Sequence, residues 1–256
     1  MSLSQDELER YSRQLPIIGV DGQLKLKNTS VLVAGAGGLA STVLYYLTAA
    51  GVGRIVFIDD GVVELSNLQR QILYDSSDIG KPKVQAAYEK LAKLNPGVAL
   101  EPVHETITRE LLSRLVPRVD LIVDALDNWN TRFLLDEAAW MHGKPLVHAG
   151  VGEYYGQLTV VIPGETPCLR YLFRGVRDEG RGGVVVLPQV PGILGLLEVN
   201  EVFKLVLGYG RPLANKMLLF NARNPSLEVI ELKVDENVKA EVLKYCGEPF
   251  RGIVKP

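Results

Sequence analysis

Short apolar runs alternate with amphipathic segments through the first 150 positions of the chain. The runs at 30–34, 54–58, 99–104, 120–125 and 145–149 have the length and the apolar character of buried parallel strands. Periodic patterns between and before them predict helices at 5–17, 22–27, 40–50, 83–94, 108–115 and 130–142. This alternation predicts an α/β fold with a Rossmann-like, doubly wound, mostly parallel sheet.

The pattern changes after position 150. Apolar stretches at 156–162, 216–220 and 227–234 are typical of antiparallel strands that extend the sheet. A segment at 193–207 is apolar on most faces, which predicts a helix buried in the core or in a subunit interface. No linker divides the chain, so we expect one domain over 1–256.

Composition and charge exclude several classes of protein. A net charge of −2 gives no sign of a nucleic-acid or membrane surface. No apolar run is long enough to span a membrane, and the polar, acidic start of the chain is unlike a signal peptide. Two cysteines do not form a secreted disulfide framework. We therefore expect a cytoplasmic protein with no membrane and no nucleic-acid partner.

A glycine-rich turn follows the first predicted strand. Gly35, Gly37 and Gly38 allow backbone N–H groups to approach a phosphate at the start of the next helix. Asp59 ends the second strand, where a carboxylate accepts hydrogen bonds from ribose hydroxyls. This order predicts a nucleotide site, although a tight turn with Asp59 as a loop cap is the simpler alternative.

A polar cluster beyond the turn indicates that the ligand is a polyphosphate. The segment 66–71 carries three amide side chains and one arginine among Ser66, Asn67, Leu68, Gln69, Arg70 and Gln71. Lys83 follows further along the chain. An NAD-dependent oxidoreductase would share the glycine turn and Asp59, but would give no reason for these residues. The alternative for Arg70 and Lys83 is that they are ordinary solvated charges.

With these motifs the chain resembles the ThiF/MoeB/HesA family, relatives of ubiquitin-activating enzymes. Family members adenylate the C-terminal glycine of ubiquitin-like sulfur carriers, releasing pyrophosphate. The resemblance covers nearly the whole chain and includes these segments: 10–14 (RYSRQ), the glycine turn, 66–71 (SNLQRQ), 78–83 (DIGKPK), Asp127-Asn128 with Thr131-Arg132, 156–158 (GQL) and 208–210 (GYG).

The resemblance implies ATP and Mg²⁺ as cofactors and a small β-grasp protein ending in Gly-Gly as partner. It also implies a homodimer with shared active sites, in which Arg13 reaches the phosphates bound by the other subunit. Residues 1–150 would bind nucleotide, and 151–256 would serve the partner and the dimer, with a crossover loop near 173–183. The residues implied to bind ATP are Gly35, Gly37, Gly38, Asp59, Ser66, Asn67, Leu68, Gln69, Arg70, Gln71, Lys83, Asp127 and Asn128.

The implied reaction needs charge neutralisation more than it needs a base. A C-terminal carboxyl has a pKa of ~3.5, so it is already ionised at neutral pH. Cationic donors and Mg²⁺ would let this anion approach ATP. The implied catalytic residues are Arg13, Arg70, Lys83 and Asp127, of which Asp127 would hold Mg²⁺.

Three of these functional interpretations have simpler structural alternatives. Asp127 could cap the helix that begins near position 130. Arg13 could pair with Asp6 or Glu7. His148, at the end of a strand, is expected to be a core histidine and not a catalyst.

The chain departs from the family pattern in three places. Ala40 replaces the last glycine of the turn, and Gly61 replaces an acid that Asp60 could supply. Relatives often bind zinc through two Cys-x-x-Cys pairs, but only Cys168 and Cys246 remain here, so we expect no zinc. Whether these two thiols are free or form a disulfide is open. The crossover loop has no cysteine and a glycine-rich tip at 180–183, so catalysis would end at the acyl-adenylate.

Two other functions share this fold and motif set. One is adenylation of a small-molecule or tRNA-borne carboxylate, and the other is a catalytically inactive scaffold. The sequence does not distinguish thiamine, molybdopterin, tRNA-thiolation and protein-modifier pathways, and it does not reveal the sulfur donor.

Overall fold

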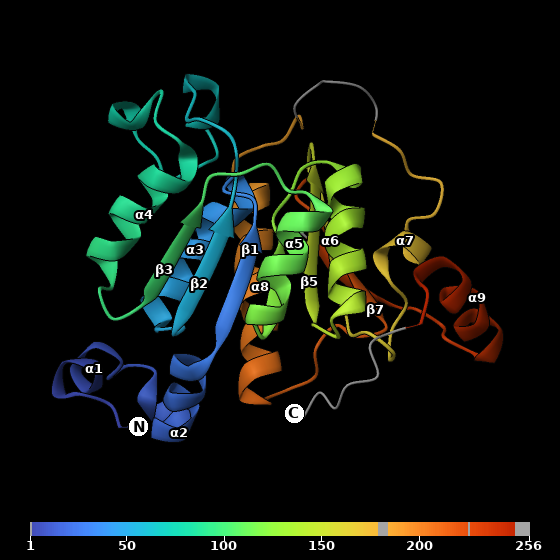
Figure 1. Cartoon of the computed structure of the whole chain (residues 1–256), viewed down its shortest axis with the longest axis horizontal. Helices are drawn as coiled ribbons and strands as arrows, with labels where there is room; N and C mark the ends of the chain where they lie inside the picture. The colour runs from blue at the N-terminus through green and yellow to red at the C-terminus, as the bar shows by residue number, and fades with distance from the viewer. Residues whose placement is uncertain (1, 179–183, 225, 249–256) are drawn as a thin grey trace.

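A single mixed sheet organises the molecule, with helices on both of its faces (Figure 1). The computed structural model describes residues 2–178, 184–224 and 226–248. Within them, eight strands follow the order β3-β2-β1-β4-β5-β6-β7-β8. Their bounds are β1 Ser30–Ala34, β2 Arg54–Ile58, β3 Ala99–Val103, β4 Leu121–Asp124, β5 Leu146–Gly152, β6 Tyr155–Val161, β7 Lys216–Asn221 and β8 Ser226–Glu231.

The pairing of the strands confirms the predicted fold class. Strands β1 to β5 pair in parallel, and β6, β7 and β8 extend the sheet by antiparallel pairing. Strand β1 lies between β2 and β4, so the chain reverses its direction of winding at β1. Ligands of doubly wound sheets bind at the carboxyl ends of the strands beside such a reversal.

The helices form one layer on each face of the sheet. The helices and the short 3₁₀ turns are α1 Gln5–Arg10, α2 Leu15–Asn28, α3 Gly38–Ala50, η1 Leu65–Asn67, η2 Ser76–Asp78, α4 Lys83–Leu94, α5 Arg109–Leu115, η3 Val116–Arg118, α6 Trp129–Met141, α7 Leu169–Leu172, α8 Gln189–Leu207 and α9 Glu236–Cys246. Side chains of α3, α4 and α8 share one buried cluster, and those of α5, α6 and α7 share the other.

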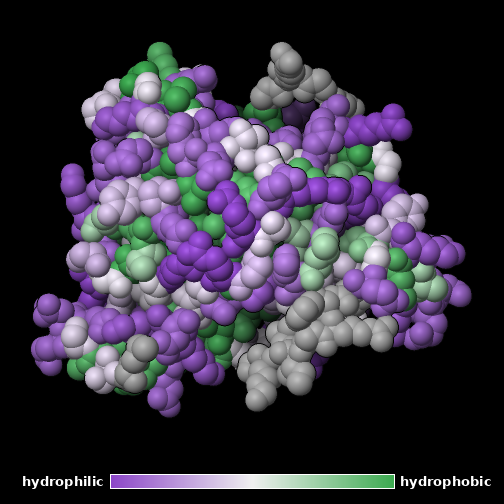
Figure 2. All heavy atoms as spheres, in the orientation of Figure 1, coloured by the Kyte–Doolittle hydropathy of each residue, from purple (hydrophilic) through white to green (hydrophobic). Residues whose placement is uncertain are grey.

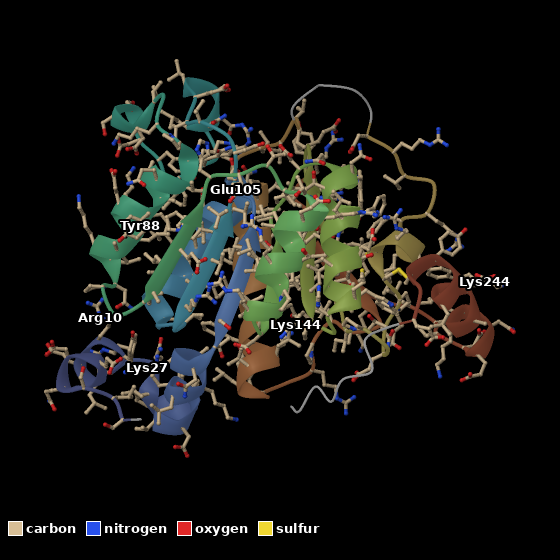
Figure 3. The ribbon with its side chains drawn as sticks, in the orientation of Figure 1. Arg10, Lys27, Tyr88, Glu105, Lys144 and Lys244 are labelled. Carbon is tan, nitrogen blue, oxygen red and sulfur yellow. A yellow bond between two sulfur atoms is a disulfide. The ribbon has the colours of Figure 1, made fainter. Side chains whose placement is uncertain are left out.

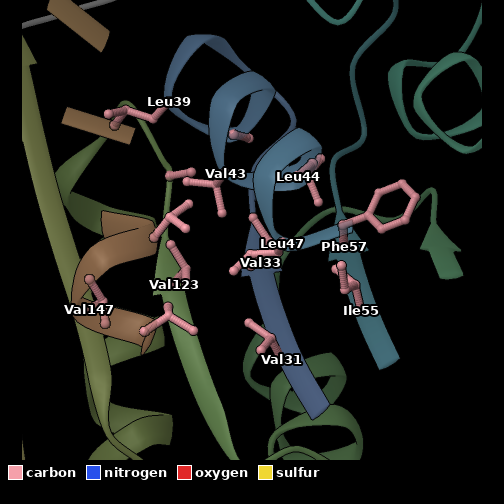
Figure 4. Close-up of a cluster of buried hydrophobic side chains, with 14 of the residues drawn as sticks. Val31, Val33, Leu39, Val43, Leu44, Leu47, Ile55, Phe57, Val123 and Val147 are labelled. Carbon is pink, nitrogen blue, oxygen red and sulfur yellow. The ribbon is translucent and has the colours of Figure 1, made fainter. Parts of the chain in front are cut away.

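The larger core lies between α3 and the sheet (Figure 4). Helix α3 contributes Leu39, Val43, Leu44 and Leu47, all fully or almost fully buried. They cover apolar side chains from β1, β2, β4 and β5, namely Val31, Val33, Ile55, Phe57, Val123 and Val147. Burial of these side chains, each worth about 1.5–3 kcal/mol, fixes α3 and therefore its N-terminus at the sheet edge.

Helix boundaries differ from the predictions in three regions. The expected helix at 5–17 is two helices, because α1 ends at Arg10 and α2 begins at Leu15 and kinks at Gly19, whose φ is 71°. Helix α8 begins at Gln189 and not at 193, because Pro191 lies in its first turn, where a missing N–H costs nothing. Helix α9 was not predicted, since Val242 is its one buried residue and the helix lacks a clear apolar stripe.

Hydrophilic side chains predominate on the face shown in Figure 2, with hydrophobic ones in smaller groups between them. None of the helices in the described part of the chain combines the length and the hydropathy that crossing a membrane requires. The buried helix α8 packs against α3, β5 and β6. The apolar side chains of α8 therefore lie in the core, which is one of the two locations that the sequence predicted for this segment.

Candidate nucleotide and carboxylate site

A cavity of about 620 Å³ opens at the carboxyl ends of the parallel strands. One arm is lined by the glycine turn and by cationic and acidic side chains: Gly35, Gly37, Gly38, Asp59, Arg70, Gln71, Lys83 and Asp127. The other arm runs along the antiparallel strands and is lined by Gly150, Val151, Gly152, Tyr155, Gly156, Gln157, Leu219, Phe220, Asn221, Ser226 and Glu228. The cavity therefore runs from the glycine turn to the antiparallel strands, with Asp127 and Gly150 both in its wall.

The glycines of the turn have different physical roles. Gly35 has φ of 98°, and a Cβ there would lie 2.6 Å from the carbonyl oxygen of Ala125. Gly37 is the N-cap of α3, and a Cβ there would meet nothing closer than the side chain of Gln71 at 3.8 Å. Gly35 is thus required by packing, whereas Gly37 leaves the helix N-terminus open to an anion in the cavity.

Asp59 shapes the turn and also lines the cavity. Its Oδ2 accepts a hydrogen bond from the N–H of Ala36 at 2.8 Å, and its Oδ1 accepts one from the N–H of Gly61 at 2.8 Å. A carboxylate has further lone pairs, so these bonds leave acceptors for a ligand. The suggestion that Asp60 replaces the missing second acid is wrong, because Asp60 accepts a hydrogen bond from Thr106 at 2.6 Å and does not line the cavity.

The 66–71 segment divides into supporting residues and cavity residues. Arg70 and Gln71 line the cavity together with Lys83 from the start of α4. The Oε1 atom of Gln71 is buried without a hydrogen-bond partner in the described structure, so a ligand donor would satisfy it.

The remaining four residues of this segment do not line the cavity. Asn67 accepts from the N–H of Glu64 at 3.1 Å, Gln69 donates to the carbonyl of Val186 at 3.5 Å, Ser66 donates to Glu64, and Leu68 packs on the core. The structure therefore gives Ser66, Asn67, Leu68 and Gln69 the contacts of supporting residues, which leaves their predicted nucleotide contacts as predictions.

Asp127 is free for a ligand because its neighbour caps the helix. Asn128 is the N-cap of α6 and accepts a hydrogen bond from the N–H of Thr131 at 2.9 Å. Asp127 is exposed at the cavity wall, and its Oδ1 accepts a hydrogen bond from the Asn128 amide at 3.4 Å. The alternative in which Asp127 caps α6 is therefore wrong.

The crossover segment reaches the same helix terminus. Asp178 accepts hydrogen bonds from the N–H of Trp129 at 2.6 Å and of Asn130 at 3.0 Å. The ring of Phe173 lies 4.5 Å from that of Trp129. Arg174 lies over the ring of Tyr171, whereas the glycine tip at 180–183 lies outside the described residues.

Arg13 lies away from the cavity of its own chain. It is exposed between α1 and α2 and is absent from the cavity wall. Glu7, one of its suggested local partners, forms an ion pair with Lys27 at 2.6 Å. Arg13 therefore does not reach the cavity of its own chain, and its contact with phosphates bound by a second subunit stays a prediction.

Several buried polar residues lie beneath the cavity, and of these the sequence analysis placed only His148 in the core. Burial lowers the pKa of His148, so the imidazole is neutral at pH 7, and its Nδ1 lies 2.7 Å from Asp124 Oδ2. Burial opposes ionisation of Asp124, but Arg132 and His148 keep its pKa below the ordinary value. Burial raises the pKa of Glu198 well above its ordinary value. His148 is thus a core residue, as expected.

The sequence analysis assigned no role to Arg132 or to the second arm of the cavity, although Gly156 and Gln157 belong to the 156–158 segment of the family resemblance. Arg132 belongs to a quoted motif, which was the available signal, but the motif alone does not show what its guanidinium contacts. Gln157, Asn221 and Glu228 meet only through strand pairing, since β6 and β7 are separated by a long stretch of chain.

Cys168 and Cys246 form a disulfide that joins α7 to α9, with their Cα atoms 6.3 Å apart (Figure 3). Tyr171, three residues after Cys168, donates a hydrogen bond to Glu241 on α9. The described residues contain no group of three or more His, Cys, Asp or Glu side chains that could hold a metal. A site for Mg²⁺ would therefore need ligand oxygens besides Asp127.

Comparison with known proteins identifies the family. The profile of the ThiF family matches residues 11–242, and the chain belongs to this family. It is 40% identical to the sulfur carrier protein adenylyltransferase of Thermus thermophilus, over 97% of this chain and 94% of that one. It is 36% identical to the SAMP-activating enzyme E1 of Haloferax volcanii, over 97% and 92%.

A solved structure shows the same fold. A crystal structure of E. coli MccB superposes with a TM-score of 0.80 at 24% identity, covering 89% of this chain and 73% of that one. Together, the family and the named relatives identify the chain as an adenylyltransferase that uses ATP.

Proposed function

We propose that this enzyme adenylates the C-terminal glycine carboxylate of a small ubiquitin-like sulfur carrier. The products are the carrier's acyl-adenylate and pyrophosphate. The observation that supports this most strongly is the two-armed cavity, in which a cationic arm meets a glycine-lined arm. The names of the relatives support a sulfur carrier or ubiquitin-like protein as the acyl substrate.

The cationic arm suits the polyphosphate of ATP. The open N-terminus of α3 at Gly37, with Arg70 and Lys83, offers positive charge and N–H donors to phosphate oxygens. Gln71 lines the same arm, and its buried Oε1 would accept a hydrogen bond from a donor group of the nucleotide and not from a phosphate oxygen. Asp127 would hold Mg²⁺, a hard cation that accepts one carboxylate together with phosphate oxygens and water. Bound there, the ion would neutralise phosphate charge.

The second arm suits an extended, unbranched peptide end. Gly150 is one of its walls, and a Cβ there would lie 3.1 Å from Gln157 and 3.3 Å from Arg132. Glycine at position 150 therefore places bare backbone, and no side chain of its own, against an incoming peptide end. The entering carboxylate is ionised, so the protein's task is to orient it and to offset its charge against ATP.

Residues 151–256 would bind the carrier and contribute to a homodimer.

Helix α2 offers a further surface for the homodimer. Ile17 is 84% exposed and Val20 48% exposed on α2, close in sequence to Arg13. An apolar surface of this kind is suited to burial against a second copy, which would bring Arg13 to the other subunit's phosphates. Because both cysteines form the disulfide, the nucleophile that attacks the adenylate would come from another molecule.

Exchange of labelled pyrophosphate into ATP tests this function. We expect exchange that requires both Mg²⁺ and a β-grasp protein ending in Gly-Gly, and that is lost when the last two glycines are removed. Arg70→Ala should lower the exchange rate by at least ~100-fold if its guanidinium neutralises charge in the transition state. ATP binding without exchange for any carrier would favour another carboxylate, and absence of ATP binding would favour an inactive scaffold.

A further inference from the structure

A guanidinium connects the two arms of the cavity from below. Arg132, on α6, is 4% exposed and lines the cavity wall. Its Nη2 donates to the carbonyl oxygen of Leu126, and its Nη1 donates to that of Ala149 at 2.9 Å. Leu126 directly precedes Asp127, and Ala149 directly precedes Gly150. One planar group therefore bridges the ends of β4 and β5 where the two arms meet.

Asp124 and His148 hold this guanidinium in place. Asp124 Oδ2 lies 3.9 Å from Arg132 Nη1, and its Oδ1 accepts a hydrogen bond from the N–H of Leu126 at 3.1 Å. Because Asp124 can only accept, the His148 Nδ1 at 2.7 Å must donate to it, which fixes the ring and its tautomer. All three side chains are almost completely buried.

We propose that Arg132 is a positioning residue for adenylation, and that Asp124 and His148 hold it in register. By clamping Leu126 and Ala149 it sets the distance between Asp127 in the nucleotide arm and Gly150 in the carboxylate arm. This inference rests on the proposed function, since it takes Asp127 as the Mg²⁺ ligand. The inference adds a role for Arg132, Asp124 and His148, to which the proposed function assigns no contact with ATP or with the carrier.

The geometry requires arginine in particular. A guanidinium presents donors in a fixed plane, so it can bond two carbonyls on adjacent strands and face a carboxylate at once. A lysine ammonium is a point charge on a flexible chain, and it would satisfy one carbonyl or the other. The Trp129 ring, 5.2 Å from the guanidinium carbon, covers the group and restricts its alternatives.

The decisive comparison is Arg132→Lys, which keeps the charge, against the unmodified enzyme. Calorimetry of ATP binding, with and without Mg²⁺, gives a readout that does not depend on catalysis. We expect metal-free ATP affinity to change less than about twofold, and the Mg²⁺ concentration for half-maximal binding to rise about 10-fold or more. At a fixed Mg²⁺ concentration the kcat of exchange should fall and the KM for ATP should rise together with the loss of metal affinity, because binding of the metal and of the nucleotide is linked.

Substitution of His148 provides a second test, which leaves the Arg132 guanidinium itself unchanged. In His148→Asn the side-chain amide N–H can replace the Nδ1–H donor to Asp124, whereas His148→Leu cannot supply it. We therefore expect the asparagine variant to retain near-normal Mg²⁺ dependence and the leucine variant to resemble Arg132→Lys. The matched control is Arg109→Lys, which alters an exposed arginine paired with Glu137 outside the cavity.

The outcomes separate this inference from the proposed function. Equal Mg²⁺ dependence and equal kcat in Arg132→Lys and the unmodified enzyme would overturn the positioning role. A uniform loss of thermal stability and of ATP affinity in both His148 variants would also overturn it, since that result describes a folding role. If the unmodified enzyme activates no carrier, the proposed function fails, while the calorimetric comparison still gives its result.

Discussion

The carboxylate of Asp59 accepts a hydrogen bond from the backbone N–H of Ala36 at 2.8 Å, which ties the end of β2 to the glycine turn after β1. The second oxygen of Asp59 accepts from the N–H of Gly61 at the same distance. The residue that the sequence indicated as a ribose ligand is thus also the residue that holds the nucleotide turn in shape.

Asp59→Ala should therefore impair both stability and nucleotide binding. Loss of a charged acceptor for a buried N–H costs about 1–3 kcal/mol in the free energy of unfolding. We expect ATP affinity to fall at least ~10-fold, the loss of roughly one charged hydrogen bond. Urea denaturation and calorimetry measure the two effects. The control is the adjacent Asp60→Ala, which should change neither; equal behaviour of the two variants would contradict the assignment.

Substitutions of Asp127 and of its neighbour Asn128 should have different effects, one on catalysis and the other on stability. Asp127→Ala should abolish exchange and leave the melting temperature unchanged, because the exposed carboxylate makes little structural contact. Asn128→Ala should lower the free energy of unfolding by about 1 kcal/mol through loss of the α6 cap and should keep measurable exchange. An active Asp127→Ala enzyme would remove the metal assignment.

The Cys168–Cys246 disulfide should stabilise the protein. It closes a separation of 78 residues, and cross-links of this kind contribute about 2–4 kcal/mol by restricting the unfolded chain. Reduction, or the double change Cys168→Ser with Cys246→Ser, should lower stability by this amount and loosen α9. Mass spectrometry under non-reducing conditions measures the linkage directly, and two free thiols in the freshly isolated protein would contradict it.

Asp136 should make stability depend on pH. Burial raises the pKa of Asp136 to about 6, above the unfolded value of about 3.9. The folded state therefore binds more protons between these values, and stability falls as pH rises from about 4 to about 6.

Asp136→Asn should remove this dependence and raise stability at pH 7.5 by about 2–3 kcal/mol, the equivalent of the pKa shift. Urea denaturation at several pH values measures the effect. The neighbouring Glu137→Gln, whose side chain is partly exposed and paired with Arg109, serves as control. Parallel stability–pH curves for the Asp136→Asn variant and the parent would show that the buried carboxyl is not responsible.

The parallel half of the fold was predictable because its central strands, such as β1, β2 and β4, are apolar and buried on both faces. The strand Arg54–Ile58 and the helix Lys83–Leu94 have the predicted bounds. Helix α9 was not predictable, because its attachment depends on the disulfide and on Val242 more than on an apolar stripe. Local pattern identifies an element well when burial alone determines it.

The site was predictable where one short segment supplies the chemistry. Gly37, Arg70 and Lys83 line the cavity as the motifs indicated. The orientation of Asp60 and the bridging contacts of Arg132 were not, because they depend on how separate strands end beside one another. The predicted contact of Arg13 with phosphates would need a second subunit, so it stays a prediction.

Label transfer from ATP to the carrier tests the central claim most directly. The enzyme is incubated with Mg²⁺, a β-grasp protein ending in Gly-Gly, and ATP labelled either at the α-phosphate or at the γ-phosphate. We predict that the α-label, and not the γ-label, appears on the carrier's C-terminal glycine, with pyrophosphate released in equal amount. Transfer of the γ-label, or no transfer to any carrier despite ATP binding, would contradict adenylation of a sulfur carrier.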